Sequence, residues 1–192
     1  MANIALLIAG GSGARMHQNI PKQFLTVNER PVIVYTLEAF QHHPEIDEIA
    51  VVCIEGWESV LWAYANQFNI TKLKYVVPGG KNGQDSIRNG VFELEKHHSP
   101  NDIVLIHDAI RPMVSAEIIS DCIRVTQLYG NAITVIPCAE AMMQTEDGVV
   151  STGSYPRDNL KRTQTPQGFP IGKICDLHRR ALKAGITNSV AF

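Results

Sequence analysis

Short apolar runs alternate with longer amphipathic segments along most of this chain, and this alternation constrains the fold more than any other feature. In the run from Ile103 to Ile106 consecutive side chains are all apolar, so both faces of such a strand must be buried. Strands of this kind are typical of a parallel sheet covered by helices on both faces. The alternation therefore predicts an α/β fold: a Rossmann-like, doubly wound, mostly parallel sheet with right-handed crossovers.

The same pattern places the individual elements. The expected strands are Ile4–Ile8, Glu48–Ile54, Lys72–Val77, Ile103–His107 and Ala132–Pro137. The expected helices are Val32–Gln41, Trp57–Gln67, Gln84–Lys96 and Ala116–Tyr129, the last with Ser115 as N-cap and Gly130 as C-terminal stop. The pattern ends after Pro137, and turn residues with short β-prone pieces over residues 138–165 predict a β-arm that projects from the sheet. A further helix is expected at about Lys173 to Ala184.

Composition and charge place the chain among ordinary soluble globular proteins. Of the 192 residues 45% are hydrophobic and 19% are charged, which suits a single domain over residues 1–192 with one full core. The net charge of −2 argues against nucleic acid or an anionic membrane as a partner. No cleavable signal or membrane-spanning run is evident, and the four cysteines are scattered without a Cys-x-x-Cys pair. We therefore expect a cytoplasmic protein with reduced, mostly buried thiols.

The strand expected at Ile4–Ile8 opens into a glycine loop that is followed by two cations. The loop reads Ala9-Gly10-Gly11-Ser12-Gly13-Ala14-Arg15-Met16, and Pro21-Lys22-Gln23-Phe24 comes shortly after it. Glycines let backbone N–H groups approach a polyanion closely and converge on it. The cations Arg15 and Lys22 suit a phosphate chain on which charge builds during a reaction. We interpret this segment as a nucleotide-triphosphate site.

Two commoner glycine loops do not match this sequence. A Walker A loop ends in Gly-Lys-Ser/Thr, whereas here Gly13 is followed by Ala14-Arg15. A dinucleotide-binding loop needs a third glycine, where this chain has Met16, and an acidic residue about 20 positions later. The nearest candidate, Glu38, falls inside an expected helix. An ordinary tight turn is the remaining alternative, and the Arg-Met and Pro-Lys-Gln-Phe sequences at this spacing argue against it.

Further polar motifs follow two other expected strands. They read Pro78-Gly79-Gly80-Lys81 and His107-Asp108-Ala109-Ile110-Arg111-Pro112. Because ligands of such sheets bind beyond the carboxyl ends of the strands, both motifs are expected beside the glycine loop. Asp108 could hold Mg²⁺ against triphosphate oxygens, or it could form an N-cap or a loop ion pair with Arg111. Ser86 could hydrogen-bond a nucleobase or cap the helix that begins near residue 84.

Polar residues also gather near the expected arm, and histidines occur in two adjacent pairs. The arm cluster suits recognition of a second phosphate, with a solvated hairpin as the alternative, and consists of Arg157, Arg162, Thr163, Thr165 and Gln167. Neighbouring side chains on a helix point about 100° apart, so adjacent histidines make poor joint metal ligands. We interpret the pairs His42-His43 and His97-His98 as solvated helix ends.

Five motifs in this order resemble those of the polyol-phosphate cytidylyltransferases, and the resemblance covers essentially the whole chain. The motifs are Ala9–Met16, Pro21–Phe24, Gly79-Gly80 with Asp85-Ser86, His107–Pro112 and Gln164–Gln167. The resemblance implies a CTP-dependent nucleotidyltransferase that moves CMP from CTP to a sugar-alcohol phosphate, releases pyrophosphate and uses Mg²⁺ or another divalent cation. Members of the family act on ribitol 5-phosphate or 2-C-methyl-D-erythritol 4-phosphate.

The resemblance also implies a role for each matching residue. Arg15, Lys22 and Arg157 would be catalytic, and Asp108 would bind the metal ion. Nucleotide binding would fall to Ala9, Gly10, Gly11, Ser12, Gly13, Ala14, Gly79, Gly80, Asp85 and Ser86. The acceptor would contact Asp108, Arg111, Arg157 and Thr165. Because the arm of the family crosses into a neighbouring subunit, the resemblance implies a homodimer in which Arg157 acts in trans.

The sequence departs from the family pattern at three places. Gly83 stands where the family has arginine, and Glu140-Ala141 stands where the arm begins with Asp-Thr. The chain stops at Phe192, where the family continues with a lysine-bearing strand and a closing helix, so we expect a truncated product with impaired turnover. Phe24 and Glu55-Gly56-Trp57 slightly favour ribitol 5-phosphate as the acceptor. A nucleotidyltransferase that uses UTP and a non-catalytic nucleotide-binding paralogue remain as alternatives.

Overall fold

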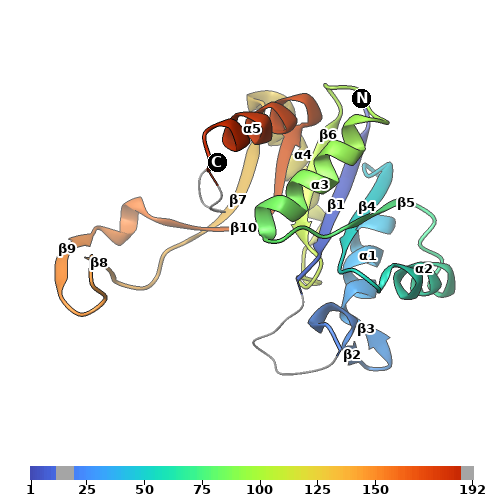
Figure 1. Ribbon diagram of the computed structural model, residues 1–192, viewed down its shortest axis with the longest axis horizontal. Helices are drawn as coiled ribbons and strands as arrows, with labels where there is room; N and C mark the ends of the chain where they lie inside the picture. Colours follow the sequence, from blue (N-terminus) through green and yellow to red (C-terminus); the bar gives the residue numbers. More distant parts are fainter. Residues whose placement is uncertain (12–19, 187–192) are drawn as a thin grey trace.

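A six-stranded sheet forms the centre of the computed structural model, which describes residues 1–11 and 20–186 (Figure 1). Its strands are β1 (Asn3–Ala9), β4 (Glu48–Cys53), β5 (Leu73–Pro78), β6 (Ile103–Asp108), β7 (Ala132–Pro137) and β10 (Lys161–Pro170). They lie in the order β5-β4-β1-β6-β10-β7. All neighbouring pairs are parallel except those of β10, which runs antiparallel to both β6 and β7. The predicted α/β fold with a mostly parallel sheet is confirmed.

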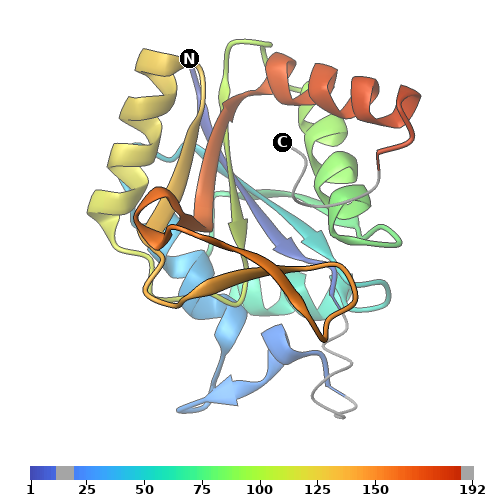
Figure 2. The same ribbon diagram turned by 90° about the vertical axis from the view of Figure 1, so that its left-hand side faces the viewer.

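Helices cover both faces of this sheet (Figure 2). The first face packs against α1 (Val32–Gln41), α2 (Glu58–Gln67) and α4 (Ala116–Tyr129), and the second against α3 (Gly83–Glu95) and α5 (Ile171–Lys183). Successive residues of β1 alternate between the two cores: Ala5 and Leu7 belong to the first, and Ile4 and Leu6 to the second. This double burial is the reason why the strand sequences are apolar at consecutive positions.

The predicted boundaries agree closely with the structure. The ends of β7, α1 and α4 are as expected, the other predicted ends differ by about one residue, and α5 begins about two residues earlier. The predicted caps of α4 are confirmed, because the Ser115 side chain accepts a hydrogen bond from the Ile118 amide at 3.4 Å, and Gly130 has a left-handed φ of +79°. No helix in the described part of the chain is both long and apolar enough to cross a membrane.

The described residues also form two small hairpins and two short 3-10 turns. The first 3-10 turn, η2 (Lys22–Phe24), leads into a hairpin of β2 (Thr26–Val27) and β3 (Arg30–Pro31). The second hairpin pairs β8 (Met142–Thr145) with β9 (Ser151–Tyr155), and η3 (Arg157–Asn159) follows it. This second hairpin projects away from the sheet as an arm whose strand residues are all exposed (Figure 1).

The strand β10 differs from the sequence-based expectation, which assigned no strand to its residues and placed residues 161–165 in the arm. Lys161 pairs with Pro137 at the root of the arm, whereas Gln167 lies between Ile106 of β6 and Ile133 of β7. The register shifts between Thr163 and Gln167, around Pro166, which cannot donate a ladder hydrogen bond. The polar sequence before Pro166 carries no local strand signal, and its residues pair only with β7, whereas those after Pro166 also pair with β6.

The packing of β10 against α4 generates a prediction about stability. A Cβ at Gly168 would lie 2.1 Å from Thr126 Oγ1 and 3.2 Å from Cys122 Sγ. We expect Gly168→Ala to destabilise the protein by about 1–3 kcal/mol, because an overpacked site must move its neighbours. Gly153→Ala in the arm is the matched control, since its Cβ would meet only Gln144 Oε1, at 3.9 Å. Equal midpoints of urea unfolding for the two variants would contradict the prediction.

Candidate active site

The candidate site lies at the carboxyl edge of the sheet, where the strand order changes direction. From β1 the chain moves first to β4 on one side and later to β6 on the other, and ligands of open α/β sheets bind at such a point. The register pairs Ile8 at the end of β1 with Asp108 at the end of β6. A cavity of about 630 Å³ opens here and is lined by Gly10, Gly11, Lys22, Gly80, Ser86, Asp108 and Arg111, among others.

The glycines of this cavity are needed for two different reasons. A Cβ at Gly10 would lie 3.2 Å from the Gly79 Cα and 3.1 Å from Ser86 Oγ. A Cβ at Gly80 would lie 2.3 Å from the Asp85 Cβ, so the loops after β1 and β5 pack directly on each other and on α3. A Cβ at Gly11, in contrast, would meet no atom within 4 Å. Gly11 therefore leaves open space at the cavity, whereas Gly10 and Gly80 permit close packing.

Hydrogen bonds fix the loop between β5 and α3. The Asn82 side chain caps α3 by accepting a hydrogen bond from the Asp85 amide at 2.9 Å. The Ser86 hydroxyl accepts one from the Gly80 amide and donates one to the Asn82 carbonyl, both at 3.0 Å. Ser86 is therefore not the N-cap, and it holds the Gly79-Gly80 turn against the helix. Because Asn82 and the first residue of α3 line the cavity, the positive end of the helix dipole lies at its wall.

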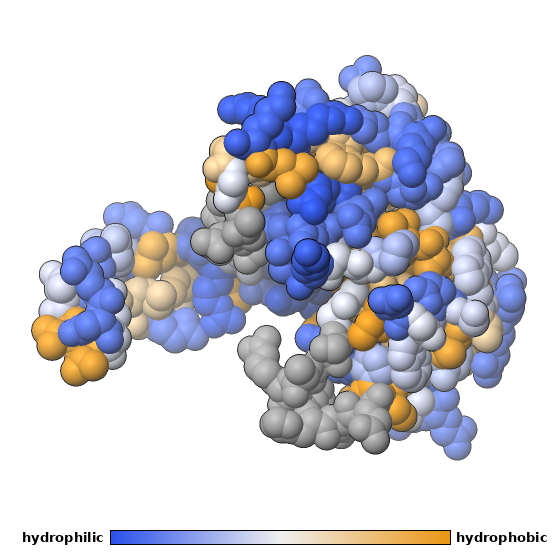
Figure 3. Space-filling view, in the orientation of Figure 1, coloured by the Kyte–Doolittle hydropathy of each residue, from blue (hydrophilic) through white to orange (hydrophobic). Residues whose placement is uncertain are grey.

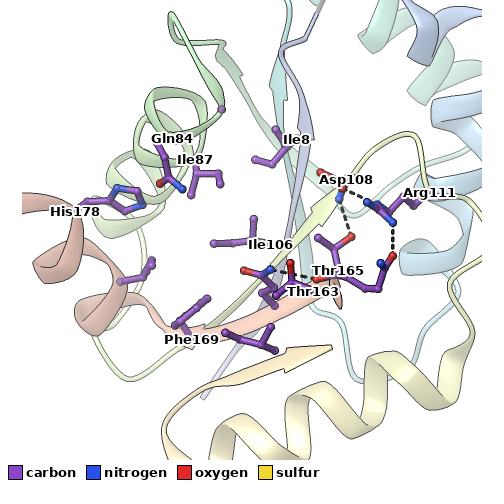
Figure 4. A pocket seen from close by; sticks show the side chains of 15 residues that line it. Ile8, Gln84, Ile87, Ile106, Asp108, Arg111, Thr163, Thr165, Phe169 and His178 are labelled. Atoms are coloured by element: carbon purple, nitrogen blue, oxygen red, sulfur yellow. Dashed lines mark hydrogen bonds and ion pairs between the residues drawn. The ribbon is translucent and has the colours of Figure 1, made fainter. Parts of the chain in front are cut away.

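An ion pair lies within the loop after β6, and two hydrogen bonds tie this loop to β10. Arg111 Nε donates to Asp108 Oδ2 at 2.6 Å, and both side chains are about two-fifths exposed, at 45% and 40%. The same guanidinium donates to the Gln164 side chain, and the Asp108 amide donates to Thr165 Oγ1 at 3.3 Å. Figure 4 shows these groups together at one end of a second cavity. The loop ion pair that was the alternative for Asp108 is thus present.

The second cavity, of about 350 Å³, adjoins the first and lies between α3, α5 and β10. The two cavities share Ile8, Gly83, Asp108 and Arg111. The sheet contributes polar side chains of β10, from Thr163 to Gln167, together with the apolar Ile106 and Phe169 (Figure 4). The helices α3 and α5 contribute the apolar Ile87 and Ile174 and the polar Gln84 and His178. A Cβ at Gly83, which lines both cavities, would meet no atom within 4 Å, so Gly83 leaves open space where the cavities adjoin.

Two buried histidines at the site are neutral at pH 7. His107 lies 1% exposed behind the loop, with Nε2 3.0 Å from the Arg111 carbonyl, and burial holds its pKa below the usual value. As neutral imidazole, its Nε2–H donates to that carbonyl and helps to place Arg111. His178 lines the second cavity beside Gln84, and burial lowers its pKa to about 4 (Figure 4). Both histidines are therefore uncharged at neutral pH.

Comparison with known proteins decides the family. Residues 3–191 match the family described as 2-C-methyl-D-erythritol 4-phosphate cytidylyltransferase (IspD). The chain belongs to this family of polyol-phosphate cytidylyltransferases. A ribitol-5-phosphate cytidylyltransferase of Lacticaseibacillus paracasei is 42% identical over 182 residues, covering 95% of this chain and 78% of the relative. A 2-C-methyl-D-erythritol 4-phosphate cytidylyltransferase of Clostridium botulinum is 39% identical over 183 residues, covering 94% of this chain and 78% of the relative.

Solved structures of the cytidylyltransferase family share the fold. The crystal structure of 4-diphosphocytidyl-2C-methyl-D-erythritol synthase from Anaerococcus prevotii has a TM-score of 0.81 at 25% identity and covers 98% of this chain and 78% of that chain. The 2-C-methyl-D-erythritol 4-phosphate cytidylyltransferase of Francisella tularensis has a TM-score of 0.77 at 25% identity, covering 98% and 83%. The family predicted from the five motifs is therefore confirmed.

The structure gathers most of the predicted cytidylyltransferase site residues but not all of them. Lys22, Gly80, Ser86, Asp108, Arg111 and Thr165 meet at the two cavities. Within the described part of the chain, Gly79 and Asp85 do not line either cavity: Gly79 packs on Gly10, and Asp85 pairs with Arg88 at 2.7 Å. Arg157 lies on η3 in the arm (Figure 1). Ser12, Gly13, Ala14 and Arg15 lie outside the described residues.

The structure corrects the interpretation of the histidine pairs for one member of each pair. His42 and His97 are exposed, as predicted, and His97 also stacks on Tyr75 with ring centroids 4.8 Å apart. His43, in contrast, is 3% exposed, with Nε2 3.2 Å from Ser120 Oγ of α4. The His98 side chain is 8% exposed, with Nε2 3.4 Å from Glu48 Oε2. The sequence does not reveal the burial of His43 and His98, because their partners are distant along the chain. Among residues 1–11 and 20–186, no group of three or more His, Cys, Asp or Glu could hold a metal ion.

Sequence analysis missed two further residues at the site of this cytidylyltransferase-family protein. Asn82 caps α3, and its place three residues before Asp85 is a pattern that could have indicated the cap. Gln164 holds Arg111, and no sequence signal points to that contact because it depends on the course of β10. The acceptor-side wall is therefore the part of the site that depends most on tertiary structure.

Proposed function

We propose that the protein transfers CMP from CTP to ribitol 5-phosphate and releases pyrophosphate. The observation that carries this proposal is the meeting of two cavities at Asp108 and Arg111. The first offers backbone N–H groups, Lys22 and a helix N-terminus, which suit a triphosphate. The second offers the hydroxyl and amide groups of β10, which suit a small polyol phosphate. Two cavities that share one boundary suit a reaction between two bound molecules.

In the proposed reaction an acceptor phosphate oxygen attacks the α-phosphorus of CTP. The new P–O bond forms as the bond to the bridging oxygen breaks, and pyrophosphate leaves with that electron pair. The attacking phosphate is already anionic, so the step needs no general base. The work of the protein is then to position the two substrates and to stabilise the added charge at the α-phosphate.

The charged residues have separate roles in this proposal. Lys22, which lines the nucleotide cavity, would stabilise charge at the α-phosphate together with Arg15. Arg111 and Thr165 would hold the acceptor, with Arg157 supplied by the arm. Asp108 is a single carboxylate, and Mg²⁺ is commonly held by one or two carboxylates together with substrate phosphates. Asp108 therefore fits a magnesium ion that binds along with CTP and supplies charge compensation on the phosphate oxygens.

The choice of ribitol 5-phosphate rests on relatives and on one structural feature. Relatives 35–42% identical to this chain are named ribitol-5-phosphate cytidylyltransferases, and relatives named for 2-C-methyl-D-erythritol 4-phosphate are 39% identical. The two sequence features that favour ribitol, Phe24 and Trp57, form a stacked pair with ring centroids 4.7 Å apart. They therefore support the choice as one feature and not as two independent ones.

The first test compares substrates. We expect pyrophosphate release to be fastest when CTP, Mg²⁺ and ribitol 5-phosphate are combined, because the proposal assigns both cavities to these molecules. The controls replace CTP with UTP and ribitol 5-phosphate with 2-C-methyl-D-erythritol 4-phosphate. Faster release with the second acceptor would assign the protein to that reaction, and faster release with UTP would make it a uridylyltransferase. CTP binding without release from either acceptor would indicate a non-catalytic paralogue.

A second test addresses Asp108. Asp108→Asn removes the charge that the proposal assigns to metal binding, so pyrophosphate release should fall on the order of 100-fold. Release should also need more Mg²⁺ to reach half its maximum. Asp121→Asn is the matched control, because it breaks a similar Asp–Arg pair three residues apart, with Arg124, on the exposed face of α4. An Asp108→Asn variant with wild-type rate and magnesium dependence would refute the metal role.

We further propose that the arm joins two copies of the chain. The β8–β9 hairpin carries exposed apolar side chains at its tip, including Val149, which is 86% exposed (Figure 3). An exposed apolar arm is typical of a segment that is covered by a partner. Because η3 follows the hairpin, the same contact would carry Arg157 toward the cleft of the neighbour.

Mixing two variants with strongly reduced turnover tests this arrangement. If Arg157 acts in trans, Lys22→Ala and Arg157→Ala subunits should form mixed dimers that contain one intact site. Random exchange would then restore about a quarter of the wild-type pyrophosphate release, since half the dimers are mixed and each has one intact site of two. No recovery on mixing, in a preparation that sediments as a dimer, would place Arg157 in its own subunit's site. A monomer at micromolar concentration would contradict the dimer itself.

A further inference from the structure

The segment Pro21–Phe24 joins the nucleotide cavity, the glycine loop and the core, and both Lys22 and Gln23 are among the residues that line the cavity. Gln23 is only 1% exposed, and its Nε2 donates to the carbonyls of Ala9 at 2.6 Å and Gly11 at 3.1 Å. Phe24 is buried in a stack with Trp57. A single 3-10 turn, closed by a 2.8 Å hydrogen bond from the Phe24 amide to the Pro21 carbonyl, thus joins a cation, the glycine loop and the core.

The contacts of Gln23 determine which backbone groups face the cavity. A peptide unit is planar and trans, so its C=O and the following N–H point in opposite directions. With the Ala9 carbonyl held by Gln23, the Gly10 N–H must point to the opposite side. Glycines have unusual backbone freedom, and a loop that turned its carbonyls to the cavity would repel a phosphate chain. The Gln23 amide hydrogen-bonds the Ala9 and Gly11 carbonyls, and the Ile54 amide also donates to that of Ala9, so neither oxygen is without a donor beside the cavity.

We propose that Gln23 is a positioning residue, which holds the glycine loop with its carbonyls hydrogen-bonded and in fixed register with Lys22. The inference rests on the proposed function, because it assigns a triphosphate to the cavity. Gln23 itself acts through Lys22 and the loop.

The chemistry of the glutamine side chain suits this role better than simple filling of the core. A buried amide group is costly unless it is hydrogen-bonded, and an apolar side chain would fill the same volume without that cost. One NH₂ group carries two donors, and here they serve two carbonyls that are two residues apart. Asparagine is shorter by one methylene, and ionised glutamate would place a negative charge against both carbonyls. The stack of Phe24 on Trp57 and Tyr64, with centroids at 4.7 and 6.5 Å, anchors the turn that carries Gln23.

The first experiment combines Gln23→Met with Lys22→Ala. Gln23→Met keeps the length of the side chain and removes both donors, so kcat/KM for CTP should fall about tenfold, which corresponds to about 1.4 kcal/mol. In the double variant the two fold-losses in kcat/KM should not multiply, because Lys22→Ala already removes the cation whose position Gln23 is proposed to fix. Thr126→Val is the matched control: it loses a buried 2.7 Å hydrogen bond to the Cys122 carbonyl, away from the cleft. In Thr126→Val, kcat/KM for CTP should fall less than twofold, and this loss should multiply with that of Lys22→Ala.

The second experiment separates this inference from the proposed function. The amide of Ile54 donates to the Ala9 carbonyl at 3.2 Å, so its hydrogen exchange reports on the peptide that Gln23 holds. Exchange at Ile54 should be faster in Gln23→Met than in the wild-type protein and unchanged in Thr126→Val. This exchange measurement does not depend on turnover. A wild-type protein that releases no pyrophosphate would therefore overturn the proposed reaction but not the role of Gln23. Unchanged exchange in Gln23→Met, or losses that multiply with Lys22→Ala, would overturn the role of Gln23.

Discussion

The close approach of Gly10 to Gly79 sets the geometry of the carboxyl edge of the sheet. Gly10 follows β1 and Gly79 follows β5, with β4 between these strands, and a Cβ on Gly79 would lie 3.2 Å from the Gly10 Cα. The two loops therefore close over the end of β4, where the Gly79 amide donates to the Cys53 carbonyl at 2.8 Å. This closure brings the start of α3, with Ser86, against the glycine loop. Without it the helix dipole and the loop would not share one cavity.

The sequence predicts well what depends on local burial and poorly what depends on distant partners. Strands such as Ile103–Asp108 are buried on both faces, so their apolar runs identify them and their ends. The strand β10 gives no such signal, because its first half is polar and exposed and its second half is interrupted by Pro166. It inserts antiparallel between β6 and β7, which no local pattern indicates. His43 is similar, since its burial depends on Ser120 of another helix.

The same limit applies to individual site residues. Lys22, Asp108 and Arg111 could be predicted because they directly follow strand ends or the glycine loop, and parallel strands bring their carboxyl ends to one edge. Gly79 and Gly11 look equivalent in the sequence. The structure separates them, because a Cβ at Gly79 would meet backbone atoms and one at Gly11 would meet none. A glycine that permits packing and a glycine that admits a ligand differ only in their tertiary surroundings.

The Phe24–Trp57 stack places a limit on how acceptor preference can arise. Phe24 is buried, 3% exposed, and belongs to the core below η2, whereas the polar wall of the second cavity comes from β10. Phe24 therefore does not touch the part of the site to which the acceptor is assigned. It can affect the reaction only through the position of its neighbours Lys22 and Gln23. In the proposed assignment, direct discrimination between a ribitol chain and a methyl-branched one would fall to residues that line the second cavity, such as Thr163 and Ile87.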